Sequence, residues 1–204
     1  MRVRAAVLRE MGLPAPYAQS LPLSIEEVVL APPGPGELRV RVRAAGLCHS
    51  DLSVVNGDRA WPMPIVLGHE AAAEVVEIGP GGSDLSVGDA VVLIFRPTCG
   101  ACLSCSTGRP ALCGPGGDAN GAGSLLGGYR RLMAAGGREG IGARPDGVLN
   151  HHMGCSAFAE YATVSRRSVV RIDPGLAWDE AALFGCAVLT GAGAVFNTAR
   201  MEGG

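Results

Sequence analysis

Four cysteines stand close together in the chain, at Cys99, Cys102, Cys105 and Cys113, with the spacing C-x2-C-x2-C-x7-C. Gly, Ala, Ser and Pro residues separate them, rather than the apolar pattern of a core segment. Four thiolates so close in sequence can surround a single tetrahedral ion, and such a closed set is typical of a structural zinc site. The spacing therefore predicts one zinc ion held within residues 99–113.

Two other interpretations of this array are less favoured. Disulfide bonding fits poorly because the chain has seven cysteines, an odd number, and no leader peptide precedes them. An iron–sulfur cluster is the rival metal site, since C-x2-C-x2-C also opens ferredoxin motifs. In those motifs the fourth cysteine follows after three residues and precedes Pro, whereas here seven residues intervene.

A second set of candidate ligands is spread along the chain: Cys48, His69 and Cys186. One imidazole and two thiolates would leave a fourth zinc position open for water or substrate, as catalytic zinc sites require. Taken singly, each residue has a simpler explanation, with the cysteines as small core residues and the histidine hydrogen-bonded in a turn. Their presence together with the array favours a second, catalytic site.

Composition limits the classes of function. The chain has 204 residues, enough for one large or two small domains, and a net charge of −2 without a basic block. Nucleic acid is therefore not expected as a partner. The N-terminal segment MRVRAAVLRE has no long apolar stretch and no cleavage-type sequence, so we expect neither a signal peptide nor a membrane anchor. A cytoplasmic protein, in which thiols stay reduced and free to bind metal, is expected.

Short β-branched or alternating runs bounded by Gly, Pro and Asp predict strands in the first part of the chain. They are residues 2–8, 37–43, 71–79, 89–94, 158–164 and 168–172. The run 37–43 is the clearest, because it alternates Leu and Val with Arg. Together these runs indicate a small β-barrel or sandwich.

The remaining segments differ in character. The Gly-rich composition of 114–147 predicts flexible lobe or loop structure. After Asp173-Pro174 the pattern becomes helical, with Asp179 and Glu180 suited to a first turn and an apolar stretch running to Arg200.

Several segments carry a family resemblance, in order and at consistent separations. They are CHSDLSVVNGD (48–58), GHEAAAEVVEIG (68–79), VGDAVVL (87–93), the cysteine array and GCAVLTGAGAV (185–195). The chain thereby resembles the zinc-dependent alcohol dehydrogenases of the medium-chain dehydrogenase/reductase family. The resemblance implies a mainly β (α+β) fold with short helices. It implies a GroES-like, partly open β-barrel catalytic domain over 1–177, with a structural-zinc lobe at about 96–116. Residues 178–204 would form a helical segment leading to a Rossmann domain that this chain lacks.

The resemblance also implies roles for individual residues. The catalytic zinc ligands would be Cys48, His69 and Cys186, and the structural ones Cys99, Cys102, Cys105 and Cys113. Asp51 would orient the ligand histidine, Glu70 would lie behind the metal, and Ser50 would hydrogen-bond the substrate hydroxyl. His49 and Thr190 would contact the cofactor. The substrate pocket would include Phe95, His152 and Met153.

The implied activity is hydride transfer between a primary or aromatic alcohol and NAD(P), giving an aldehyde or ketone, with two zinc ions per chain and a homo-oligomeric full-length enzyme. The substrate is a small alcohol or aldehyde. Two departures from the family narrow this expectation. Ser53 stands where many relatives place a histidine that ends the proton path, and His49 or water would substitute for it. Arg59 and Gly117 stand where glutathione-dependent relatives place an acidic and a basic residue, which disfavours a glutathione conjugate and leaves Arg59 to attract another anionic group.

A dinucleotide-binding fingerprint, Gly-x-Gly-x-x-Gly after a strand, is not found in the sequence. Gly191-Ala192-Gly193 resembles its opening but lies in a helical stretch, so we interpret these glycines as a site of close helix packing. The chain is therefore expected to be a catalytic-domain fragment that does not turn over alcohol by itself. The alternative hypothesis is a non-catalytic zinc-binding domain retained for assembly or partner binding. The survival of Cys48, Ser50, His69, Glu70 and Cys186 favours the enzyme.

Overall fold

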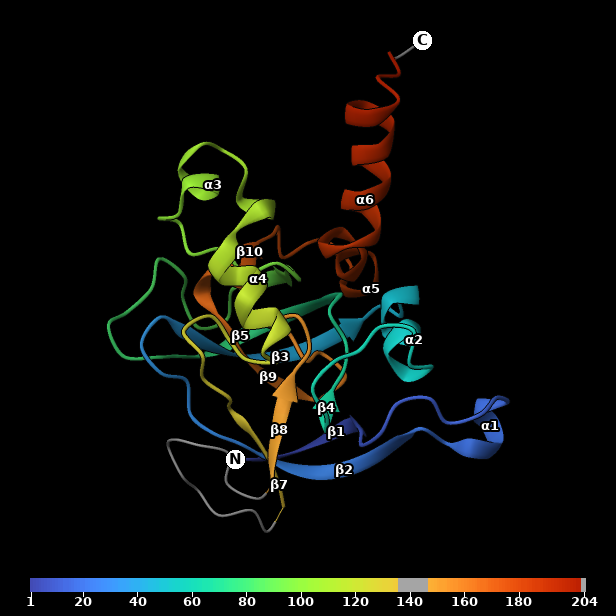
Figure 1. Cartoon of the computed structure of the whole chain (residues 1–204). Helices are drawn as coiled ribbons and strands as arrows, with labels where there is room; N and C mark the ends of the chain where they lie inside the picture. Colours follow the sequence, from blue (N-terminus) through green and yellow to red (C-terminus); the bar gives the residue numbers. More distant parts are fainter. Residues whose placement is uncertain (136–146, 203–204) are drawn as a thin grey trace.

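A computed structural model describes residues 1–135 and 147–202 of the chain. Its strands form two sheets, which lie together in the body of the molecule in Figure 1. The first sheet closes on itself in the order β1-β2-β7-β8-β4. Its strands are β1 (Arg2–Leu8), β2 (Leu23–Leu30), β7 (Leu132–Ala134), β8 (Val148–His151) and β4 (Ile65–Val66). Buried Val3, Val7, Val28, Leu30 and Leu149 belong to its core.

The second sheet is open and has the order β10-β6-β5-β3-β9. Its strands are β10 (Val169–Arg171), β6 (Ala90–Leu93), β5 (Ala71–Ile78), β3 (Glu37–Ala45) and β9 (Tyr161–Ser165). Leu38 and Val40 of β3 are buried in its core, while Arg41 on the opposite face is exposed. A closed barrel beside an open sheet confirms the expected mainly β architecture.

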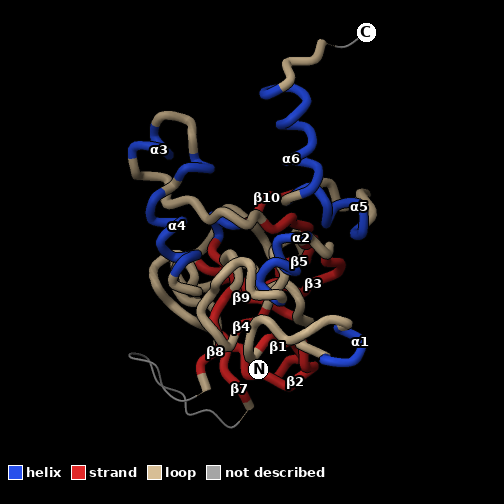
Figure 2. Tube along the Cα trace, turned by 45° about the vertical axis from the view of Figure 1, so that its right-hand side comes forward, coloured by secondary structure: helices blue, strands red, loops and turns tan. Residues whose placement is uncertain are grey.

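The short helices lie around these sheets. They are α1 (Tyr17–Ser20), α2 (His49–Val55), α3 (Leu103–Ser106), α4 (Gly114–Gly121), α5 (Trp178–Ala182) and α6 (Ala187–Gly193). Three 3-10 turns, η1 (Pro110–Leu112), η2 (Arg166–Ser168) and η3 (Leu183–Gly185), and a π-helical turn, η4 (Ala194–Thr198), complete the described elements. Figure 2 shows α3 and α4 in one projecting lobe and α6 standing away from the sheets beside it.

Each of the six predicted strand runs contains a strand. Five of the six predicted runs contain a strand at nearly the predicted place, and the sixth begins later, at Tyr161, in β9. Strands β2, β4, β7 and β8 were not predicted. Asp179 and Glu180 lie in the first turn of α5, as expected.

The loop predicted for 114–147 is wrong at its beginning, where α4 forms. Pro115 stands in the first turn of this helix, a position that needs no backbone donor, and the Cys113 sulfur accepts a hydrogen bond from the Gly116 amide. Gly116 also has a packing reason, since a Cβ there would lie 1.8 Å from the Pro97 carbonyl oxygen. The prediction for 136–146 falls outside the described residues.

The close packing predicted at Gly191-Ala192-Gly193 is also wrong. Apart from its chain neighbours and the backbone of its own helix, no described residue lies within 4 Å of a Cβ built on Gly191, and α6 leaves much of its apolar surface uncovered. Phe196, just beyond α6, is 68% exposed.

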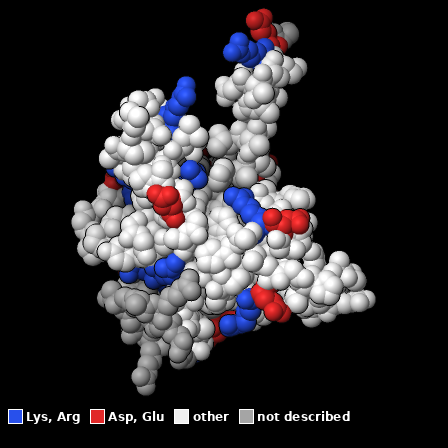
Figure 3. All heavy atoms as spheres, viewed as in Figure 1, with Lys and Arg blue, Asp and Glu red and all other residues white. Residues whose placement is uncertain are grey.

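Among residues 1–135 and 147–202, no single helix has the length and apolar composition to cross a membrane. The pair Trp178–Gly185 and Ala187–Thr198, bent by 54°, meets that test only when the two are combined. Charged side chains on the face in Figure 3 are scattered among uncharged residues rather than gathered in one basic patch.

Candidate functional site

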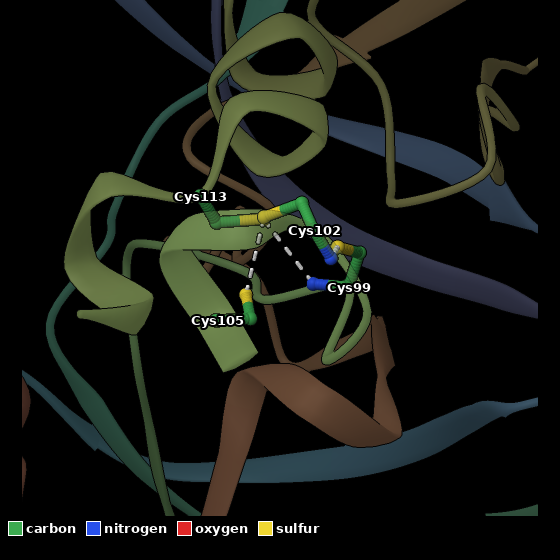
Figure 4. Close-up of side chains that lie close together, drawn as sticks. All are labelled: Cys99, Cys102, Cys105 and Cys113. Carbon is green, nitrogen blue, oxygen red and sulfur yellow. Dashed lines mark hydrogen bonds between the residues drawn. The ribbon is translucent and has the colours of Figure 1, made fainter. Parts of the chain in front are cut away.

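The four-cysteine array forms one compact cluster in the lobe of α3, η1 and α4 (Figure 4). The four sulfur atoms all lie within 4.8 Å of one another. The Cys102 sulfur is 3.5 Å from that of Cys105 and 3.9 Å from that of Cys113. Two thiolates on a tetrahedral zinc ion, each about 2.3 Å from it, stand roughly 3.8 Å apart. The donor set and its spacing therefore fit zinc.

Backbone amides already surround these sulfurs. The Cys113 sulfur accepts from the amide of Cys99 at 3.2 Å, and the Cys99 sulfur accepts from the amide of Cys102 at 3.3 Å. Hydrogen bonds from the amides of Ala101 and Cys102 lower the pKa of Cys99 to about 6, whereas burial raises that of Cys105 to about 11. The turn thus favours at least one thiolate before any ion binds.

The second cluster gathers Cys48, His69, Glu70 and Cys186, whose candidate ligand atoms also lie within 4.8 Å of one another. Cys48 precedes α2, His69 lies between β4 and β5, and Cys186 stands between η3 and α6. The Cys48 and Cys186 sulfurs are 4.0 Å apart, although 138 positions separate the two residues. Two thiols, an imidazole and an adjacent carboxylate are a donor set that zinc accepts.

Asp51 organises this cluster from α2. Its Oδ1 lies 3.2 Å from His69 Nδ1 and accepts from the Gly68 amide at 3.1 Å, while its Oδ2 accepts from the Cys48 amide at 3.2 Å. Because Nδ1 is engaged by the carboxylate, Nε2 is the His69 nitrogen left for a metal. The carboxylate therefore holds both a candidate ligand ring and the backbone of a candidate ligand thiol.

The ionisation of these groups follows from their surroundings. Burial alone would raise the pKa of Asp51, but hydrogen bonds from His152 and His69 hold it well below its usual value. Burial opposes a charged His69, but the hydrogen bond and charge of Asp51, together with the neighbouring Cys48, outweigh burial and raise the pKa of His69. Burial likewise opposes a Cys48 thiolate, yet hydrogen bonds from Ser50 and the nearby His69 lower the pKa of Cys48.

The two thiols of this cluster differ. Burial, then the neighbouring Cys48 sulfur, raises the pKa of Cys186 to about 12. Without a cation the pair therefore holds at most one negative charge near neutral pH. A divalent ion would stabilise the second thiolate, which is the usual coupling of metal binding to proton release.

A cavity of about 360 Å³ opens beside this cluster. Its lining includes six of the site residues predicted from the sequence, namely Ser50, His69, Phe95, Met153, Cys186 and Thr190. Arg59 and Gly117, which the sequence marked as departures from the family, also line it, and Trp61, Arg96, Asn120 and Gly121, which no motif predicted, complete it. A lone aromatic, arginine or amide carries no spacing signal, so only packing reveals these positions.

Two predicted residues lie elsewhere. His152 is fully buried behind the cavity, with its Nδ1 3.3 Å from Asp51 Oδ1 and its ring edge-on to Trp61 and His69. It supports the wall rather than lining it. His49 borders a separate, apolar groove beside α1 and α2, and its Nδ1 lies 3.3 Å from the Ser53 hydroxyl. Glu70 Oε1 accepts from the Ala187 amide at 3.3 Å, which connects the cluster to α6.

Comparison with known proteins gives a consistent result. Residues 34–174 match the alcohol dehydrogenase GroES-like domain. The chain is 38% identical to an S-(hydroxymethyl)glutathione dehydrogenase of Synechocystis sp., over 100% of this chain and 51% of that protein. It thus spans about half the length of the curated relatives it matches.

Two solved structures are similar over nearly the whole chain. An alcohol dehydrogenase zinc-binding domain protein from Burkholderia ambifaria superposes with a TM-score of 0.84 at 35% identity, covering 100% of this chain and 50% of that one. Benzyl alcohol dehydrogenase from Acinetobacter calcoaceticus gives 0.79 at 31% identity, covering 97% and 48%. The chain therefore belongs to the zinc-dependent alcohol dehydrogenases of the medium-chain dehydrogenase/reductase family, and carries their GroES-like domain.

Proposed function

We propose that the protein containing this chain is a zinc-dependent alcohol dehydrogenase, which moves a hydride between a primary or aromatic alcohol and NAD(P). The observation that supports it most is the convergence of Cys48, His69 and Cys186 beside a cavity large enough for a small alcohol. A purely structural domain has no need for donors that meet at an open cavity. The array would hold a second zinc ion, making two per chain.

The chain's own residues suit this reaction. Zinc would supply Lewis acidity at the alcohol oxygen, and the nicotinamide would accept the hydride. Ser50 lines the cavity and offers a hydroxyl to receive and pass on the alcohol proton. Asp51 fixes the His69 ring, and His152 packs behind both, so the site is held before substrate enters.

Beyond Ser50 the proton path departs from the family pattern, because Ser53 stands where many relatives have a histidine. Ser53 and His49 form a pair on α2, and the imidazole is exposed to solvent. We assign this pair the role of passing the proton outward when cofactor is bound. Thr190 lines the cavity from α6 and would contact the cofactor there.

The proposal also covers the domain boundaries, the cellular location, the oligomeric state and the substrate class. Residues 1–177 would be the catalytic domain and 178–204 the beginning of the connection to a cofactor domain. The enzyme would be cytoplasmic and homo-oligomeric, and no nucleic acid or membrane partner is proposed. Aromatic alcohols are favoured because Trp61, Phe95 and Met153 line the cavity, and because the Acinetobacter structure similar to this chain is named for benzyl alcohol.

The experiment is metal analysis and turnover of the protein at its natural length. We expect two zinc ions per chain, no iron–sulfur absorbance, and benzyl alcohol oxidation with NAD or NADP. A protein that holds both ions yet oxidises no primary or aromatic alcohol with either cofactor would instead support the non-catalytic zinc-binding domain.

A further inference from the structure

The chain has 17 arginines, which differ in whether a carboxylate lies beside them. Eight form ion pairs with carboxylates: Arg2, Arg4, Arg9, Arg39, Arg43, Arg131, Arg166 and Arg171. The two that line the cavity, Arg59 and Arg96, have no carboxylate within ion-pair distance in the described part of the chain. The described cavity lining also contains no Asp or Glu. Two positive charges therefore face this space without a counter-charge.

Arg96 is built into the cavity wall. Its NH2 nitrogen donates to the Cys113 carbonyl oxygen at 3.2 Å, which ties the side chain to the cysteine lobe. Its Nε is buried and makes no hydrogen bond to any described residue. The Arg96 guanidinium thus has hydrogen-bonding capacity that the described acceptors do not fill, and its charge has no carboxylate partner among the described residues.

Gly117 provides the room for this guanidinium. A Cβ at position 117 would lie 2.8 Å from the Arg96 NH2 nitrogen and 3.2 Å from its Cζ. The guanidinium thus occupies space that a side chain at 117 would take. Glycine at position 117 therefore permits the observed position of the Arg96 side chain.

Two further groups extend the polar side of the cavity. Arg59 lies with its Cζ 5.2 Å from the centre of the Trp61 ring, a cation–π position that holds the charge at the mouth. Asn120 is only 7% exposed, and its Oδ1 is buried without a hydrogen-bond partner while its Nδ2 donates to the Phe95 carbonyl oxygen. The side chains of Arg59, Arg96 and Asn120 thus line one polar side of the cavity.

We propose that this cavity selects an alcohol or aldehyde whose far end carries a carboxylate, bound by Arg96 with Arg59 at the mouth. The inference rests on the proposed function for the reacting end and adds the chemistry of the other end. The guanidinium fork matches a carboxylate in shape and charge. The reacting hydroxyl lies at the cysteine and histidine cluster, and the aromatic side chains of the lining contact the middle of the substrate.

The first test compares 4-(hydroxymethyl)benzoate with benzyl alcohol, which has the same reacting group and lacks the charge. For the protein at its natural length, we expect kcat/KM to be on the order of ten- to a hundredfold higher for the carboxylate, the range of one charge-assisted hydrogen-bonded pair. Arg96→Gln should abolish this preference and Arg59→Gln should reduce it. Arg41→Gln removes the same charge from an exposed position outside the cavity and should leave the preference unchanged.

Gly117→Ala tests the position of the Arg96 guanidinium without changing Arg96 itself. Alanine is favourable in a helix, so α4 should persist, while the new Cβ must push the flexible Arg96 guanidinium aside. We expect this variant to lose most of the carboxylate preference with unchanged thermal stability. This keeps the test informative if Arg96→Gln disturbs the cysteine lobe.

Binding without turnover separates this inference from the proposed function. Of the two tryptophans in this chain only Trp61 lines the cavity, so the fluorescence change that Trp61→Phe removes reports on benzoate entering the cavity. Saturable, salt-sensitive benzoate binding that Arg96→Gln abolishes supports the inference even if no alcohol is oxidised. Benzyl alcohol oxidation with no carboxylate preference and no benzoate binding overturns it while leaving the dehydrogenase intact. S-(hydroxymethyl)glutathione serves as a larger carboxylate source, and turnover of it that depends on Arg96 would support the inference and identify a longer substrate.

Discussion

The two cysteine-containing clusters are assembled in opposite ways. The array takes all its donors from residues 99–113, and backbone amides of the same turns donate to its sulfurs. The second cluster draws Cys48 and Cys186 together across 138 positions and depends on Asp51 and the sheets to hold them. The array therefore depends mainly on local chain conformation, whereas the second cluster depends on the whole fold. Loss of the array should therefore affect stability, and loss of the second cluster should affect chemistry.

The largest expected effect is on stability, from Cys102→Ser. The lobe around the array has little buried apolar surface, with α3 and η1 contributing no buried residue, so metal binding would supply much of its folding free energy. We expect a fall of several kcal/mol in the free energy of unfolding, with lower soluble yield and one zinc lost. Thermal unfolding and metal analysis measure both. Normal stability with lost turnover would mean that the roles of the two clusters are reversed.

Cys186→Ala should have the reciprocal effect. The variant removes one donor from the cavity cluster, where Cys186 is half-buried and stands between η3 and α6. We expect turnover to fall by roughly a thousandfold or more, as for loss of a central catalytic group. Zinc should fall from two ions to one, with the melting temperature nearly unchanged. If the variant retains two zinc ions, Cys186 is not needed for metal binding and the proposed zinc site at the cavity is wrong.

A smaller effect is expected from Asp51→Asn, which keeps the size of the side chain and removes its charge. The amide can no longer hold His69 Nδ1 as a charged acceptor does. Loss of such a supporting group commonly weakens metal binding by about ten- to a hundredfold. Competition with a chelator should show weaker zinc retention in the cavity site and unchanged retention in the array. Equal weakening of both sites would argue against their independence.

The smallest expected effect is a pH dependence of stability that arises from His151, which belongs to neither cluster. Burial, with Arg130 and Arg131 nearby, lowers the pKa of His151 to about 3. The unfolded chain binds this proton below about pH 6.5, whereas the folded chain resists it, so the stabilisation is complete above that pH and is lost as pH falls. Between pH 7 and pH 5 we expect a loss of roughly 1–2 kcal/mol from this residue.

Urea unfolding at the two pH values measures that loss. His151→Asn should be less stable at pH 7, because the Arg131 amide donates to His151 Nε2 at 3.0 Å, but its stability should depend less on pH. An unchanged pH slope in the variant would show that His151 is not the group responsible.

The cysteine array and strands such as β3 could be predicted from the sequence because their patterns are local. Four cysteines separated by two to seven residues cannot move far apart, and a strand such as β3 shows its buried face in its own alternation. The ligands of the cavity cluster required a resemblance, since no local spacing joins Cys48 to Cys186.

Tertiary structure alone decided the rest. Strands β4 and β7, of two and three residues, are too short to show a period, yet they close the barrel. The sequence could not tell whether His152 lines the cavity or lies behind its wall. Packing places it behind the wall, where it is fully buried. Arg96 and Asn120 have no motif at all, and their positions follow from how α4 lies against the Phe95–Pro97 segment. Chain spacing fixed the local metal-binding array, whereas the shape and charge of the cavity arose from contacts between segments distant in sequence.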